Sequence, residues 1–75
     1  MSITHNGMKL VYKKTGLPVN QGDIVVDHAG YRYTVDSGQS PHREGSTGRI
    51  YVMGPQANMP QGFFPSVFDC KWVSA

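Results

Sequence analysis

The sequence predicts a small all-β domain of about five short strands. Residues 22–35 alternate in side-chain character on both sides of Ala29 and Gly30, which is the pattern of two strands joined by a turn. Nine glycines and five prolines supply frequent turns in a chain of 75 residues. No stretch has the pattern of an amphipathic helix. A chain of this length forms one domain with a minimal core.

The first third of the chain predicts a lead-in, one strand and a connector. Residues 1–7 are small and polar, so we expect a flexible lead-in ahead of a single domain over residues 8–75. Met8–Tyr12 alternates imperfectly and predicts a strand at a sheet edge, where Lys9 discourages pairing with another edge. A proline then disfavours helix, and the connector that follows is expected to bury Leu17 and Val19.

The centre of the chain predicts a hairpin, a polar loop and a further strand. Gly30 can adopt a positive φ without a Cβ clash, which places the hairpin turn there. Residues 36–48 contain no large apolar side chain, and a loop this long in a small domain is either functional or mobile. In Arg49–Met53 the alternation returns, with Ile50 and Val52 expected inward.

The last part of the chain predicts a second irregular connection over residues 54–62 and then the closing elements. Pro65 suits the first position of a tight turn, so Pro65–Phe68 predicts one turn of 3-10 helix. Residues 70–73 predict the last strand. Since no helix is available to cover a flat sheet, the strands are expected to close into a small, partly open barrel.

Residues 62–68 carry a resemblance to a known fold family. The run Gly-Phe-Phe-Pro-Ser-Val-Phe resembles the G-x-F-P-x-x-Y segment ahead of the final strand of SH3-like domains. The resemblance implies an SH3-like barrel. The A-L-Y-D-Y segment, the Trp-Trp pair and the acidic loop of SH3 signalling domains are missing from the sequence. The resemblance therefore does not extend to binding of proline-rich peptides.

A second resemblance covers most of the chain. It is carried by K-K-T-G-x-P-V from Lys13, G-D-I-V-V from Gly22, S-T-G-R-I-Y-V from Ser46, and F-P-S-V ahead of Trp72. This series resembles small uncharacterised proteins of tailed bacteriophages. The resemblance implies an accessory protein that acts in the cytoplasm of the bacterial host, and it implies no known chemistry.

Composition excludes several classes of protein. Seven Lys and Arg against five Asp and Glu leave a formal charge of +2, short of the basic stripe of a dedicated nucleic-acid binder. Cys70 is alone, so an intrachain disulfide and a multi-cysteine zinc site are excluded, and an intracellular setting is expected. Neither a signal peptide nor an apolar run of about 18 residues is present, so no membrane association is expected.

The polar loop contains the first candidate site. The loop contains His42, Arg43 and Arg49 together with hydroxyl groups and with glycines whose backbone N–H groups could face an anion. We therefore weigh anion binding against a solvated, mobile loop. A Walker ending is absent, so nucleotide hydrolysis is not supported. The spacing of the three histidines and Cys70 matches no metal motif, and no cofactor, metal or catalytic residue is expected. Cys70 is expected to be a small buried apolar group.

Four Tyr, three Phe and one Trp exceed what a minimal barrel buries. Core packing is favoured for Phe64, Phe68 and Trp72. The leading hypothesis is a non-enzymatic interaction module that binds a host or phage protein. Its proposed protein-binding residues are Tyr31, Tyr51, Phe63 and Arg49.

Two alternatives remain open. The first is a nucleic-acid-binding barrel, in which basic residues contact phosphates and tyrosines stack on bases. Its residues are Arg32, Arg43, Arg49, Lys13 and Lys14. The second is a minor structural component of the virion, which predicts oligomers.

Overall fold

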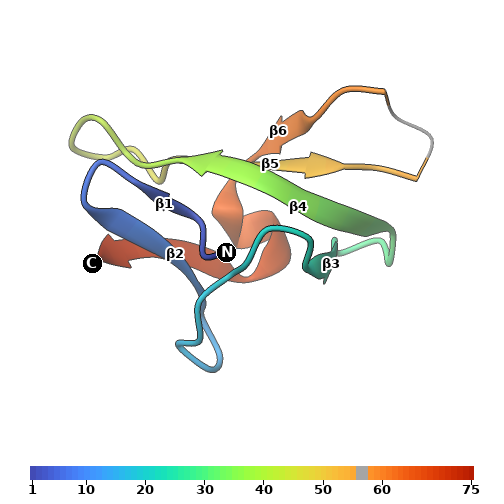
Figure 1. Ribbon diagram of the computed structural model, residues 1–75, viewed down its shortest axis with the longest axis horizontal. Helices are drawn as coiled ribbons and strands as arrows, with labels where there is room; N and C mark the ends of the chain where they lie inside the picture. The colour runs from blue at the N-terminus through green and yellow to red at the C-terminus, as the bar shows by residue number, and fades with distance from the viewer. Residues whose placement is uncertain (56–57) are drawn as a thin grey trace.

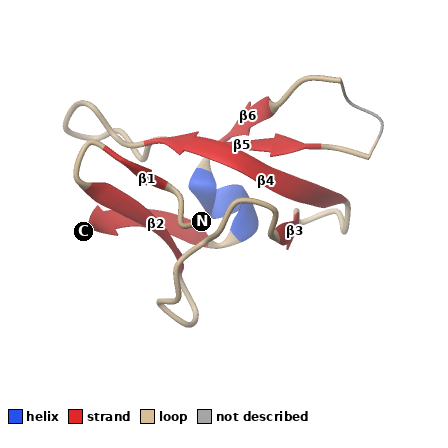
Figure 2. Cartoon of the chain, viewed as in Figure 1, coloured by secondary structure: helices blue, strands red, loops and turns tan. Residues whose placement is uncertain are grey.

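The computed structural model describes residues 1–55 and 58–75, which form an all-β fold with one short 3-10 helix (Figure 1). The elements are β1 (Thr4–His5), β2 (Met8–Tyr12), β3 (Ile24–Val26), β4 (Arg32–Gln39), β5 (Arg49–Met53), β6 (Gln61–Phe63), η1 (Pro65–Phe68) and β7 (Cys70–Ser74). In Figure 2, η1 is the helical segment in a fold otherwise made of strands and loops. The all-β class and the 3-10 turn are confirmed.

The described strands form two separate antiparallel sheets, with the orders β1-β2-β7 and β3-β4-β5-β6. About five strands in one partly open barrel were predicted, whereas seven strands, β1 to β7, are present in the described residues, and no ladder there joins the two sheets into a closed barrel. Each sheet instead covers its apolar face with the other, an arrangement in which helices are not needed as a second layer.

The N-terminal residues belong to the domain, so the expected lead-in is wrong. β1 pairs with β2, and Ile3 is 6% exposed within the core. The Ile3 N–H donates to the Val19 carbonyl at 2.9 Å, and the Leu10 N–H donates to the Ile3 carbonyl at 3.0 Å. Because β1 and β7 flank β2, β2 is the central strand of its sheet and not an edge strand. The buried side chain of Ile3 and the backbone pairing of β1 together anchor this segment.

Two residues of the connector between β2 and β3 were expected to be buried, and one of them is. Val19 is fully buried, and its N–H donates to the Leu10 carbonyl at 2.9 Å. Leu17 is 62% exposed, contrary to the prediction. Its carbonyl accepts the Tyr12 N–H at 3.0 Å. Regular alternation in an extended segment would place Leu17 and Val19 on the same side. Their different burial shows that the alternation does not extend back to Leu17, which directly follows the turn with Gly16 at φ 71°.

The predicted hairpin is present as β3 and β4, with Val25 opposite Tyr33 and Gly30 at φ 90° in the turn. Asp27 holds this turn, since its carboxylate accepts the Ala29 N–H at 2.9 Å and the Tyr31 N–H at 3.0 Å. β4 then continues to Gln39, into the region where the sequence predicted a loop.

A β-bulge in β4 decides which side chains face the core. Pairing shifts between Val35 and Ser37, so that Val35 lies opposite Val52 and Gly38 lies opposite Ile50. The extra residue reverses the alternation beyond it. Gly38 therefore faces inward, where a Cβ would lie 2.7 Å from Cζ2 of Trp72. The indole occupies the space that a larger residue would fill.

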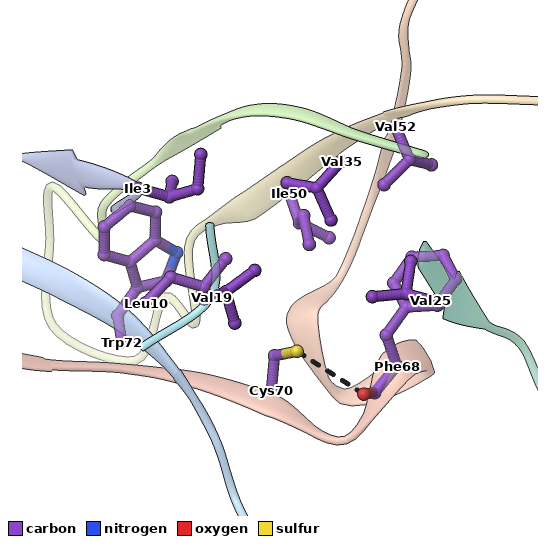
Figure 3. Packing of buried hydrophobic residues seen from close by; sticks show 10 residues of the cluster. All are labelled: Ile3, Leu10, Val19, Val25, Val35, Ile50, Val52, Phe68, Cys70 and Trp72. Atoms are coloured by element: carbon purple, nitrogen blue, oxygen red, sulfur yellow. Dashed lines mark hydrogen bonds between the residues drawn. The ribbon is translucent and has the colours of Figure 1, made fainter. Parts of the chain in front are cut away.

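The core lies between the two sheets (Figure 3). Ile50 and Val52 are fully buried, as the alternation of β5 predicted. Phe68 and Trp72 are buried, and Cys70 is a buried free thiol, also as predicted. The other buried members of the cluster are Ile3, Leu10, Val19, Val25 and Val35.

Candidate functional site

The loop between β4 and β5 encloses the larger candidate site. Residues 39, 40 and 42–49 together with Phe64 line a concave pocket of about 580 Å³, called here the loop pocket. His42, Arg43 and Arg49 bring cationic or protonatable groups to it, and Ser46 and Thr47 bring hydroxyl groups. The residues that the sequence predicted to contact an anion therefore all line one cavity.

Both ends of the loop are fastened to the fold. At its start, the Ser40 N–H donates to Nδ1 of His5 at 3.0 Å. The Ser40 hydroxyl oxygen lies 2.8 Å from the same ring nitrogen. Ser40 is 1% exposed. His5 therefore ties the first sheet to the loop.

At the other end of the loop, Gly48 is buried at φ 74°. Its N–H donates to the Ser46 hydroxyl at 3.2 Å. A Cβ on Gly48 would lie 2.6 Å from the Gln39 carbonyl oxygen and 2.8 Å from Nε1 of Trp72. Only glycine fits this close approach of the loop to the core, because the conformation is left-handed and the space is filled.

Arg49 and Phe64 form the outer rim of the loop pocket. The guanidinium carbon of Arg49 lies 5.1 Å from the centroid of the Phe64 ring, within the range of a cation–π contact. Phe64 is 55% exposed, which corrects the expectation that it packs in the core. The reason is alternation: Phe64 is extended at φ −68° and ψ 140°, and its neighbour Phe63 takes the inward position.

Tyr51 lies next to this rim on the outer face of β5. A Cβ on Gly62 would be 3.0 Å from Cε1 of Tyr51, so the ring lies over that glycine. The Tyr51 hydroxyl donates to Oε1 of Gln39 at 3.1 Å, and Gln39 is paired with Arg49 across the two strands. Tyr51 is half-buried and holds Gln39 beside the pocket.

The structure separates the other proposed protein-binding residues from the loop pocket. Tyr31 is 67% exposed but precedes β4, whereas the loop follows it, so the two lie at opposite ends of a strand roughly 25 Å long (Figure 1). Phe63 packs inward, with ring centroids 5.4 Å from both Tyr33 and Phe68. Phe63 thus belongs to the core edge, and Phe64 is the exposed ring.

The basic residues are likewise divided. Arg43 and Arg49 share the loop pocket, together with the carboxylate of Glu44. Arg32 lies on the hairpin end of β4, and Lys13 and Lys14 lie in the turn that follows β2 (Figure 1). Of these five residues, Arg43 and Arg49 are the ones that line the loop pocket.

The loop pocket can bind an anionic group through Arg43 and Arg49 and a planar or apolar group against Phe64. Metal coordination instead requires several His, Cys, Asp or Glu side chains that converge on one point. No group of three or more His, Cys, Asp or Glu residues among residues 1–55 and 58–75 is arranged to hold a metal ion.

Cys70 lies on the core side and takes no part in the loop pocket. Burial raises the pKa of its thiol to about 11. Its Sγ donates to the Phe68 carbonyl at 3.4 Å (Figure 3). A thiol held neutral in this way is a weak nucleophile near neutral pH.

Phe64 is the residue that sequence reasoning missed. The available signal was the pair Phe63-Phe64 in an extended segment, where only one of two successive rings can face the core. Within the described residues, no helix is long and apolar enough to cross a membrane. A comparison of the chain with protein-family models, with curated proteins and with solved structures gives no match.

Proposed function

We propose that this chain is a non-enzymatic interaction module that binds a protein partner through the loop pocket and its rim of Arg49, Tyr51 and Phe64. The resemblance to tailed-bacteriophage proteins supports a phage accessory protein that acts on a host or phage partner in the bacterial cytoplasm. The short segment similar to SH3-like domains supports the same class of small β module.

The observation that carries the proposal is the exposed Phe64 ring stacked under Arg49 at the mouth of the loop pocket. Arginine is among the residue types most enriched at the energetic centres of protein interfaces, and aromatic residues including phenylalanine are enriched in interfaces generally. Here the pair is held in place, because Pro65 fixes the chain after Phe64 and β5 fixes Arg49.

The lining of the loop pocket selects the chemistry of the partner. Arg43 and Arg49 outnumber the single carboxylate of Glu44, so an acidic side chain on the partner is favoured. The face of Phe64 favours an aromatic or aliphatic neighbour of that acidic group. We therefore expect a partner segment in which Asp or Glu stands next to an apolar residue.

Capture from bacterial lysate on the immobilised chain tests the proposal. Phe64→Ala and Arg49→Glu should each lose the captured partner, because they remove the ring and reverse the charge at the rim. Tyr31→Ala is the matched control, since it removes an exposed ring at the opposite end of β4. Retention of every partner by both rim variants, with folding intact by circular dichroism, would overturn the proposal.

Nucleic-acid binding is the second candidate, favoured by Arg49 over the exposed Phe64 ring and by Arg43 in the lining of the same pocket. Such a site can stack one base and contact a phosphate. Titration of labelled single-stranded and double-stranded oligonucleotides at low and moderate salt distinguishes the two. Binding that weakens with salt and is lost in Phe64→Ala would establish this candidate, and an absence of binding at low salt would eliminate it.

A further inference from the structure

Strand β3 is an end strand of its sheet, so one of its two edges faces no strand in the described part of the chain (Figure 1). Its residues, Ile24–Val26, pair with β4 through the other edge. An open edge presents a row of backbone N–H and C=O groups, which is the arrangement that accepts a further strand. None of these residues lines the loop pocket, so the open edge of β3 is a surface separate from the one proposed above.

Two hydrogen bonds at the ends of β3 determine which pairs of its ladder are bonded. The Val35 N–H donates to the Asp23 carbonyl at 2.9 Å, and the Asp27 N–H donates to the Tyr31 carbonyl at 3.0 Å. Bonded and non-bonded pairs alternate along an antiparallel ladder. Val25, midway between Asp23 and Asp27, is therefore the residue of β3 that is bonded to β4.

Ile24 and Val26 are consequently in non-bonded pairs, and their N–H and C=O groups point to the open edge. Their side chains are exposed, at 60% for Ile24 and 49% for Val26, whereas Val25 is 4% exposed. The open edge is thus accessible, and its outer face carries two β-branched apolar side chains. Exposed apolar residues on an open edge favour the addition of a strand.

A carboxylate lies at each end of this edge, on the inner face of the sheet. Asp23 accepts the Tyr12 hydroxyl at 2.8 Å, and Asp27 accepts the Tyr33 hydroxyl at 3.1 Å. Asp23 and Asp27 stand two residues before and after the buried Val25, so the three side chains share one face. A strand added to this edge therefore places two of its own side chains opposite carboxylates.

These carboxylates select the kind of partner. If a second copy of this chain paired antiparallel along all of β3, Asp23 would lie opposite Asp27 of the other copy at both ends. Like charges directly opposite each other destabilise a ladder, whereas Lys or Arg at the same positions is attracted. On the outer face, Arg32 is the β4 neighbour of Val26, so apolar residues of the partner fit there better than basic ones.

We propose that the open edge of β3 binds an extended segment of a partner protein as an added antiparallel strand. The segment is apolar at the two residues that pair with Ile24 and Val26, and basic at the two residues that face Asp23 and Asp27. The N–H and C=O groups of Ile24 and Val26 each form one hydrogen bond with the added strand. The residue between the two apolar ones is small, because it faces Val25.

A short peptide of this pattern tests the proposal. The probe is acetyl-Ser-Lys-Val-Thr-Val-Lys-Ser-amide, and the readout is hydrogen exchange of single backbone amides by NMR. At peptide concentrations about ten times the dissociation constant, exchange of the Ile24 and Val26 N–H groups is expected to slow about tenfold. The Val25 N–H is already bonded to β4, so its exchange is expected to change less.

Two control peptides separate strand addition from general attraction. Glu in place of both Lys residues reverses the charge that meets Asp23 and Asp27, and N-methylation of both Val residues removes the N–H groups that bond the edge. Each change is expected to abolish the slowing. Equal slowing by the probe and either control would overturn the proposal, as would no slowing by any peptide. Slow exchange of the Ile24 and Val26 amides in the free chain, lost on dilution, would assign the edge to a second copy instead and would also overturn it.

Charge variants test the selection of the partner. Asp23→Asn and Asp27→Asn each remove one charge and keep an acceptor oxygen, and each is expected to weaken binding of the probe about two- to fivefold, the range of an exposed ion pair. Glu44→Gln is the matched control, because it removes the same charge in the loop that follows the far end of β4. An equal loss in all three variants would overturn the site. The loop-pocket proposal is independent of that result, since its rim variants are different residues.

Discussion

Alanine substitutions at three glycines with different surroundings can measure how tightly the chain packs around Trp72. Gly48 combines φ +74° with a filled space, since a Cβ would meet the Gln39 carbonyl oxygen at 2.6 Å. Gly45, in the same loop, has φ +84° and nothing within 4 Å of a Cβ. Gly38 has no positive φ but would place a Cβ 2.7 Å from Trp72. Replacing each with alanine separates backbone strain from steric conflict.

The expected free energies of unfolding follow from these surroundings. Gly45→Ala should cost about 1–2 kcal/mol, the price of a left-handed conformation with a Cβ. Gly38→Ala should cost about 1–3 kcal/mol, the range for overpacking a filled core. Gly48→Ala carries both effects and should cost about 2–5 kcal/mol. The carbonyl that it meets belongs to Gln39, which is held in the β4–β5 ladder. The entropy lost by the unfolded chain is the same in all three changes and cancels in the comparison.

Urea unfolding followed by Trp72 fluorescence and by far-ultraviolet circular dichroism measures these differences. The slope with denaturant should stay unchanged, so that the midpoint reports stability. A Gly48→Ala variant that is no less stable than Gly45→Ala would refute the reasoning, because it would show that the loop does not press on the core at Gly48.

Four other substitutions probe different parts of the fold. Leu10→Ala, at a side chain that is fully buried in the central strand β2, should lower the free energy of unfolding by about 2–5 kcal/mol in the same urea assay. His5→Ala should cost about 1–3 kcal/mol, because the buried Ser40 N–H loses its acceptor; a change below the error of the assay would show that Ser40 finds another partner. Burial raises the pKa of Cys70 to about 11, so the folded state disfavours the thiolate. The stability due to this group is complete below the unfolded pKa near 9 and is lost as the pH rises through 11. The same loss of stability between pH 9 and 11 in Cys70→Ala would exclude Cys70 as its source. Tyr12 has a pKa raised by burial and by its hydrogen bond to Asp23, so it adds to this loss at alkaline pH and Tyr12→Phe should reduce it.

The candidate site was partly visible in the sequence. The polar loop and Arg49 could be named, because a long segment without large apolar side chains cannot build a core. The rim of the loop pocket could not be named from the sequence, because Phe63 and Phe64 are equally apolar. Only the pairing of β5 with β6 decides which of the two rings faces inward. Tyr31 was correctly expected to be exposed, but its distance from the loop depends on the eight-residue length of β4.

Alternation within the chain determined the all-β class and the inward direction of Ile50 and Val52, while Gly30 and Pro65 determined the hairpin turn and the 3-10 turn. These features depend on residues close in sequence, through the alternation of side chains along a strand and the backbone preferences of glycine and proline. The tertiary structure alone decided that Ile3 enters the core, that a bulge turns Gly38 toward Trp72, and that the strands form two sheets. Such features depend on which distant strands pair and in which register, and a shift of one residue reverses every side chain beyond it.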